Sequence, residues 1–190
     1  LSCNKAFDLT MKSPFLRLLF IALAVILTDQ STKFMVMEHL KLGEQREWIA
    51  GFFRLVHWGN TGAAWSMFRD NNLVLAGIAL VALVILFFSR KHFEAHRLIG
   101  QVALGLMFGG IIGNLIDRFR IGHVVDFIYF FTYRKAGGEI GFPAFNVADS
   151  AICVGVGFLF IITLQKDNES KSIPVISSAP PKQSELDLEP

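Results

Sequence analysis

The sequence has few cysteines and few charged residues, and both shortages restrict what the protein can be. Its two cysteines are Cys3 and Cys153, and Cys153 lies inside an apolar run, so neither a disulfide framework nor a cysteine metal site is encoded. Charged residues make up 18% of the chain, against roughly a quarter in soluble domains. The net charge is only +2, and no basic cluster interleaves with aromatic residues, which argues against nucleic-acid binding.

Several catalytic signatures are also absent. No H-E-x-x-H motif occurs, and His92 and His96, although at helical spacing, have no acid positioned as a base, so a zinc protease is not predicted. Ser66 and Ser150 lack the G-x-S-x-G context of a hydrolase nucleophile. The glycine loops that bind phosphates or dinucleotides do not occur either.

Apolar sequence, in contrast, is abundant. Apolar residues make up 53% of the chain, mean hydropathy is +0.48, and there are 19 Phe residues. Four apolar segments cover about 15–36, 73–88, 98–116 and 147–164, and each approaches the roughly 17–25 residues of a membrane-spanning helix. No small-residue cleavage site follows the first segment, so we interpret it as a retained helix. The predicted fold class is an all-α membrane protein with four transmembrane helices.

The basic residues predict an orientation. Dense positive charge in short loops marks the cytoplasmic side of a membrane protein. The short connection 89–97 is such a loop, and the amino end is basic as well; the residues concerned are Lys12, Arg17, Arg90, Lys91 and Arg97. We therefore expect both termini to be cytoplasmic and the long connections, about 38–72 and 117–145, to lie outside.

We expect three parts along the chain. Residues 1–14 form an N-terminal cytoplasmic segment, in which residues 1–10 are interpreted as leader or upstream sequence because Met11 resembles a natural start. Residues 15–165 form the four-helix membrane domain. Residues 166–190 are rich in Ser, Pro, Lys and Glu and poor in aromatics, which predicts a disordered cytoplasmic tail.

Two further patterns concern packing. Residues 52–58 and 124–130, in the external connections, are rich in aromatic and β-branched residues bounded by turn residues, which predicts a small extramembrane β-sheet. Its aromatic side chains suit the membrane interface. In the third span, Gly105, Gly109 and Gly113 recur every four residues, so they share one helix face on which a neighbouring helix can pack closely.

Polar residues at membrane depth are costly, so each requires a reason. Asp29 and Lys33 stand four residues apart in the first span, which predicts an i,i+4 ion pair and leaves a functional role open. Asn60 lies in a turn-forming run with Gly62. It either serves the turn or offers a donor and an acceptor to a peptide backbone, which small neighbours would let approach.

Two acids follow the third span. Asp117 lies at the carboxyl end of the predicted helix, where the macrodipole disfavours an acid, and the adjacent Arg118 is expected to offset this. Asp126 is flanked by apolar residues and has no neighbouring base. Desolvation should therefore raise its pKa unless the fold supplies a partner.

The last span opens with Asn146 and Asp149. Their spacing predicts a capping box at the helix start, and a catalytic role for Asp149 is an alternative that can coexist with it. Asp126 and Asp149 both lie at the predicted outer membrane boundary. If the fold brings them together, they would titrate as a pair, and such a pair activates water and protonates a leaving amine in aspartic proteases.

Five short motifs occur in order within about residues 15–165. They are Asp29-x-x-x-Lys33, Asn60-x-Gly62-Ala63-Ala64, Gly113-Asn114-x-x-Asp117-Arg118, Val124-Val125-Asp126-Phe127 and Phe145-Asn146-x-Ala148-Asp149. Together they resemble the signature of the lipoprotein signal peptidases (signal peptidase II). A small departure is Trp65, where the family usually has Phe after the two alanines.

The resemblance implies an aspartic endopeptidase of the bacterial inner membrane that cleaves signal peptides from prolipoproteins, just before a cysteine carrying a diacylglyceryl group. It implies Asp126 and Asp149 as the catalytic pair at the outer face, with no metal or organic cofactor. Expected partners are lipid-modified prolipoproteins and membrane lipids, without nucleic acid, and the protein is expected to be a monomer. The residues that the resemblance implies for substrate binding or active-site support are Asp29, Lys33, Asn60, Gly62, Asn114, Asp117, Arg118 and Asn146.

Two other classes of function fit less well. A proton-coupled transporter would use intramembrane acids as a relay, but no inverted repeat or broken helix is evident, and the acids cluster near one surface. A non-catalytic scaffold would leave the costly polar motifs without a role.

Overall fold

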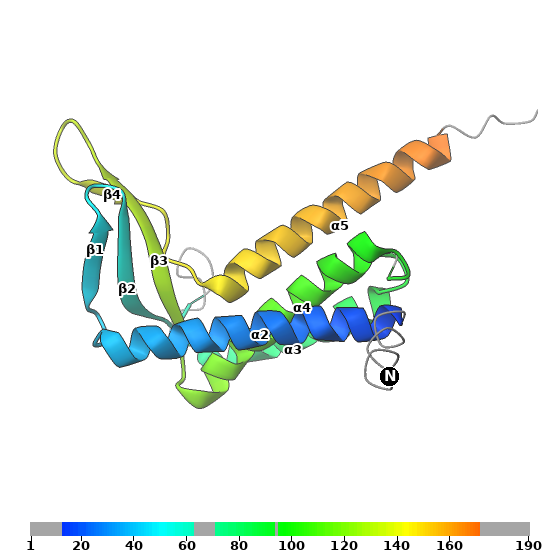
Figure 1. The fold of residues 1–190 in the computed structure, drawn as a ribbon, viewed down its shortest axis with the longest axis horizontal. Coiled ribbons are helices and arrows are strands. Elements are labelled where there is room, and N and C mark those ends of the chain that lie inside the picture. Colours follow the sequence, from blue (N-terminus) through cyan, green and yellow to red (C-terminus); the bar gives the residue numbers. More distant parts are fainter. Residues whose placement is uncertain (1–12, 63–70, 94, 172–190) are drawn as a thin grey trace, which may run out of the picture.

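The computed structural model describes residues 13–62, 71–93 and 95–171, and of residues 166–171 only the backbone. Four long helices lie alongside one another in this part of the chain, and a small β-sheet stands at one end of them (Figure 1). All four helices are long and apolar enough to cross a membrane, which confirms the predicted fold class. The helices are α2 (Pro14–His39), α3 (Asn72–Ser89), α4 (Leu98–Arg120) and α5 (Val147–Lys171).

Helix α4 is the centre of the bundle, because it packs extensively against both α2 and α5 and less against α3. Its glycine face makes the contact with α2 possible. A Cβ atom at Gly105 would lie 2.8 Å from Ile21, and one at Gly109 would lie 2.7 Å from the carbonyl oxygen of Ala22. The prediction that these glycines permit close helix packing is confirmed.

The sheet consists of four antiparallel strands in the order β1-β2-β3-β4. Its central strands are β2 (Phe53–Asn60) and β3 (Val124–Tyr133), which confirms the two strand predictions. The edge strands β1 (Gln45–Ile49) and β4 (Glu139–Gly141) were not predicted. Every residue of both edge strands is exposed, so neither has the apolar alternation by which a half-buried strand is identified.

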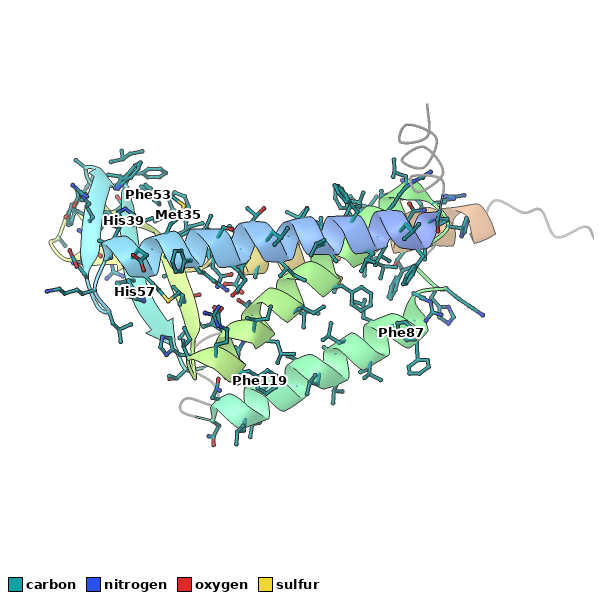
Figure 2. All side chains as sticks on the ribbon, turned by 60° about the horizontal axis from the view of Figure 1, so that its bottom comes forward. Met35, His39, Phe53, His57, Phe87 and Phe119 are labelled. Carbon is teal, nitrogen blue, oxygen red and sulfur yellow. The ribbon has the colours of Figure 1, made fainter. Side chains whose placement is uncertain are left out.

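The sheet is attached to the helix ends by an apolar cluster. Val36 and Leu40 at the end of α2 pack with Phe127, and Leu55, Ile128 and Val147 complete the cluster. His57 on β2 also binds the end of α2, since its Nδ1 lies 2.9 Å from the carbonyl oxygen of Leu40. Figure 2 shows His57 and Phe53 on the sheet beside the end of α2 that carries Met35 and His39.

The segment that leads into α5 runs along β3. Phe142 donates its backbone N–H to Phe130 over 2.9 Å, and Ile128 donates to the carbonyl oxygen of Phe145 over 2.9 Å. This pairing places Asn146, and with it the first turn of α5, next to the start of β3.

The structure moves one predicted boundary. Helix α5 continues to Lys171, beyond residue 166, where the tail was predicted to begin. Residues 166–171 contain neither Pro nor Gly, so nothing in them stops a helix once it has left the apolar span. The predictions for residues 1–12 and 172–190 lie outside the described residues.

Candidate active site

Polar side chains gather where α2, α4, β3 and the start of α5 meet, which is the sheet end of the bundle. Six of the residues predicted from the motifs are buried there, and Asn60, Arg118 and Asp149 are half-buried beside them. The buried residues are Asp29, Lys33, Asn114, Asp117, Asp126 and Asn146.

Asp126 is held by two amide side chains. Asn146 donates to its Oδ1 over 2.8 Å, and Asn60 donates to its Oδ2 over 2.9 Å. Gly62 fixes the orientation of Asn60, because its N–H donates to the Asn60 oxygen over 2.9 Å. Burial, and then the nearby charge of Asp149, raises the pKa of Asp126 to about 7. The predicted rise in this pKa agrees with the structure.

Asp149 is held by the start of its own helix and by α4. The backbone N–H of Asn146 donates to its Oδ2 over 3.2 Å, while the backbone N–H of Asp149 donates to the Asn146 side chain over 2.9 Å. This reciprocal pair is the predicted capping box. Asn114 donates to the other oxygen, Oδ1, over 2.7 Å.

Asn146 therefore connects the two acids. Its side-chain nitrogen binds Asp126 and its backbone nitrogen binds Asp149, so the carboxyl groups lie on either side of one residue. Two carboxyl groups placed in this way disfavour double ionisation, and one proton shared between them supplies an acid and a base at the same place.

A buried lysine organises the residues behind the acids. Nζ of Lys33, only 1% exposed, lies 2.9 Å from Asp29, 2.8 Å from Asp117 and 2.9 Å from the side-chain oxygen of Asn114. The predicted ion pair with Asp29 is confirmed. Asp117 forms its direct ion pair with Lys33, and the expected influence of Arg118 on Asp117 is a longer-range electrostatic interaction. Side chains of consecutive helix residues do not face each other.

Asp29 also reaches the last helix. Its Oδ1 accepts the backbone N–H of Ala148 over 3.0 Å, one of the donors that the first turn of α5 cannot satisfy within the helix. Gly113 leaves the room for this carboxyl group, since a Cβ there would lie 2.7 Å from Asp29 Oδ2.

Gln30 is a member of this network that the motif analysis missed. Its side-chain nitrogen donates to Asp117 over 2.9 Å and to the carbonyl oxygen of Gly113 over 3.2 Å. A polar residue in an apolar span was the available signal. Arg118 donates to the carbonyl oxygen of Asn114 over 3.3 Å and lies within electrostatic range of Asp149, Asp126 and Asp117. Ala63, Ala64 and Trp65 of the predicted motif lie outside the described residues.

Comparison with known proteins gives consistent similarities. A family profile described as "Signal peptidase (SPase) II" matches residues 21–165. The lipoprotein signal peptidase of Symbiobacterium thermophilum is 42% identical over 142 residues, which cover 74% of this chain and 90% of the relative. That of Bacillus pumilus is 40% identical over 152 residues, which cover 80% of this chain and 94% of the relative.

Solved structures agree with the sequence relatives. One described as "Bacterial membrane enzyme structure by the in meso method at 2.3 A resolution" matches with a TM-score of 0.67 at 35% identity, covering 83% of this chain and 92% of that one. A second structure of this kind, at 1.9 Å, has a TM-score of 0.64 at 36% identity, covering 79% and 93%. The profile, the relatives and the shared fold show that the chain belongs to the lipoprotein signal peptidase (signal peptidase II) family, the peptidases of the bacterial inner membrane.

Proposed function

We propose that the protein is an aspartic endopeptidase that removes signal peptides from prolipoproteins, and that Asp126 and Asp149 are its catalytic pair. Cleavage falls just before a cysteine that carries a diacylglyceryl group. The observation that carries the proposal is that Asn146 hydrogen-bonds both carboxyl groups, at 2.8 Å to Asp126 and 3.2 Å to Asp149. With a pKa of about 7 for Asp126, the pair retains a proton near neutral pH.

The reaction uses that shared proton. The ionised carboxylate takes a proton from a water molecule as the water oxygen bonds to the scissile carbonyl carbon, and the protonated carboxyl gives its proton to the carbonyl oxygen. The tetrahedral intermediate then collapses. The carboxyl protonated by water passes that proton to the leaving nitrogen as the C–N bond breaks, and one hydroxyl returns its proton to the other carboxylate. The pair regains its starting state.

The position of the pair suits a substrate that is confined to the membrane. A signal peptide helix and a diacylglyceryl group both lie in the bilayer, so the bond to be cleaved is presented near its surface. We further propose that the pair faces the outside and that both termini are cytoplasmic. The basic connection 89–97 supports this orientation, since it lies at the opposite end of α4 from Asn114 and Asp117.

The test is the exchange of each acid for its amide. Asp126→Asn and Asp149→Asn preserve side-chain size, but an amide cannot exchange a proton as a carboxyl does. Each variant should insert at normal abundance, still bind lipidated prolipoprotein, and accumulate uncleaved lipid-modified substrate. Normal cleavage by either variant at normal abundance refutes the proposal. If Asp149 serves only the capping box, Asp149→Asn should lose roughly 0.5–2 kcal/mol of stability and keep its activity.

Asp117→Asn is the matched control. It makes the same acid-to-amide change within the buried network, on a residue bonded to Lys33 and Gln30. Lys33 keeps its contact with Asp29 in this variant. Cleavage should therefore fall only in part, and by an amount that follows the loss of folded enzyme.

A further inference from the structure

One face of the sheet is turned toward the helix ends. Paired residues on neighbouring antiparallel strands share a face, and residues two apart on a strand do so as well. Leu55 pairs with Ile128, and Phe53 pairs with Phe130, two residues further along each strand. Leu55 and Ile128 pack against the cluster at the end of α2, and the ring of Phe145, which leads into α5, lies 6.1 Å from that of Phe130. This helix-side face therefore continues outward to Phe53 and Phe130.

The outer part of the helix-side face is an aromatic cluster. The ring of Phe130 lies 5.3 Å from Phe52, 5.4 Å from Phe53 and 6.1 Å from Phe145, and Phe142 lies 5.9 Å from Phe145. Three of these five rings are strongly exposed, with Phe52 at 53%, Phe142 at 64% and Phe130 at 36%. A soluble surface rarely exposes contiguous aromatic side chains of this extent without a partner.

The opposite face of the sheet has a different character. Arg54 forms ion pairs with Glu47 at 3.3 Å and with Glu139 at 2.7 Å, and Tyr129 donates to Glu139 over 2.9 Å. These groups are suited to water. The aromatic rings on this face are covered or carry a hydroxyl group: Phe131, only 3% exposed, lies beneath the guanidinium group of Arg54 and stacks on Tyr129. The exposed rings of the cluster on the helix-side face are all Phe, so the face of Arg54 is the more polar of the two.

We propose that the aromatic cluster of Phe52, Phe53, Phe130, Phe142 and Phe145 rests in the headgroup and upper acyl region of the bilayer that the four helices cross. The strands run across the direction of α2 and extend to one side of its end (Figure 1). A helix-side face in that position looks onto the membrane surface, in continuity with the lipid-facing sides of the helices. Aromatic side chains are the residues that membrane proteins place at this level.

A basic residue on the same face supports lipid as the occupant. Arg46 on β1 pairs with Leu55, so it belongs to the helix-side face, and it is exposed. A guanidinium group at the sheet edge suits the phosphates of lipid headgroups, which form bidentate hydrogen bonds with arginine. Phe130 is four residues from Asp126 on β3, or about 13 Å at the rise of a β-strand. Contact of the cluster with lipid would therefore hold Asp126 at a fixed depth.

The proposal is tested by measuring the depth of single sites, in the full chain, without reliance on catalysis. Cysteines are introduced by Phe142→Cys and Phe52→Cys in a background in which Cys3 and Cys153 are replaced by Ala. Each is labelled with a small fluorophore in nanodiscs of phosphatidylcholine and phosphatidylglycerol that contain lipids with a nitroxide on the acyl chain. Tyr133→Cys is the matched control, since Tyr133 is 58% exposed and bonded to Arg54 on the polar face.

Quenching by the acyl-chain nitroxide should be severalfold stronger at 142 and at 52 than at 133. Equal or weaker quenching at both sites overturns the proposal. Quenching that appears only after a bound lipidated prolipopeptide is displaced also overturns the proposal, because the substrate and not membrane lipid would then cover the aromatic cluster. Energy transfer between labels at 142 in discs that hold two copies would make a second copy the occupant. Because inactive Asp126→Asn enzyme should give the same quenching, failure here is distinguishable from failure of the proposed catalytic pair.

Discussion

Asn114 donates a hydrogen bond of 2.7 Å from its side-chain nitrogen to Oδ1 of Asp149. Lys33 donates to the oxygen of the same amide over 2.9 Å. Because an ammonium group can only donate, this contact prevents the amide from reversing. A buried lysine of the first helix thus directs the donor end of Asn114 toward Asp149, which is one member of the proposed catalytic pair.

Asn114→Asp should impair cleavage, and more severely as the pH rises. The new carboxyl group keeps the contact with Lys33, but its second oxygen replaces a donor with an acceptor facing Asp149. The two oxygens can then approach only if they share a proton, which becomes harder to retain at higher pH. We expect a loss on the order of 10²-fold in kcat at neutral pH, measured as a pH profile on lipidated substrate. A profile parallel to that of the unchanged enzyme would contradict this role of Asn114.

Lys33→Met should destabilise the protein strongly. It removes the cation that lies between Asp29 and Asp117, which are 0% and 4% exposed. Loss of one partner from a buried ion pair costs about 3–5 kcal/mol because a charge remains uncompensated. Adding Asp117→Asn to Lys33→Met should restore part of this loss, whereas Asp117→Asn alone should be destabilising. Thermal unfolding in detergent measures all three variants, and simple additivity of the two changes would argue against direct coupling.

The helices and central strands could be predicted because their signals are local. Apolar length identifies a span, and aromatic and β-branched content identifies β2 and β3. The capping box of Asn146 and Asp149 was predictable for the same reason, since its residues are three apart. Edge strands β1 and β4 gave no such signal, because exposed strands need no apolar alternation.

The site itself depends on contacts between distant parts of the chain. Asn146 meets Asp126 only because residues 142–146 pair with β3, and no spacing in the sequence encodes that register. Lys33 was predicted to pair with Asp29 on its own helix, but its contact with Asp117 requires α2 and α4 to pack closely. Family resemblance indicated that these residues belong together, and the geometry supplies the physical reason.

Asp126→Asn should make the protein more stable above neutral pH. Folding raises the pKa of Asp126 from 3.8 to about 7. Between these values the folded state binds more protons than the unfolded state, so this carboxyl group lowers stability progressively as pH rises and does so fully above about 7. Each pKa unit corresponds to about 1.4 kcal/mol. The unfolding temperature of the variant should exceed that of the unchanged protein at pH 8 but not at pH 4. An equal difference at both pH values would contradict the raised pKa of Asp126.

Reporter fusions test the proposed orientation. A fusion after Phe68 and one after Arg134 should score as external, and one after Lys166 should score as internal. The physical reason is the basic connection between α3 and α4, which carries Arg90, Lys91 and Arg97 and which we expect to be retained on the cytoplasmic side. The reverse pattern of scores would place the acid pair on the cytoplasmic side and remove it from the expected substrate.

The last prediction separates packing of the bundle from positioning of the site. A Cβ at Gly113 would lie 2.7 Å from Asp29 Oδ2, and that carboxyl group also holds Lys33 and the N–H of Ala148. Gly113→Ala should therefore displace Asp29 and disturb both the lysine network and the first turn of α5. We expect a stability loss of about 1–3 kcal/mol from overpacking, together with reduced cleavage by the molecules that remain folded.

Two matched glycines show whether this loss is specific to the site. A Cβ at Gly105 would lie 2.8 Å from Ile21, in an apolar contact remote from the acids, so Gly105→Ala should lower stability but leave the cleavage rate of folded enzyme nearly unchanged. A Cβ at Gly77 on α3 would meet no atom within 4 Å, and Gly77→Ala should be neutral or stabilising by about 0.5–1 kcal/mol. Cleavage per folded molecule, with the folded fraction taken from thermal unfolding, distinguishes the three. If Gly113→Ala and Gly105→Ala lose the same activity per folded molecule, Gly113 matters only for helix packing, and the geometry of Asp29 is not required for cleavage.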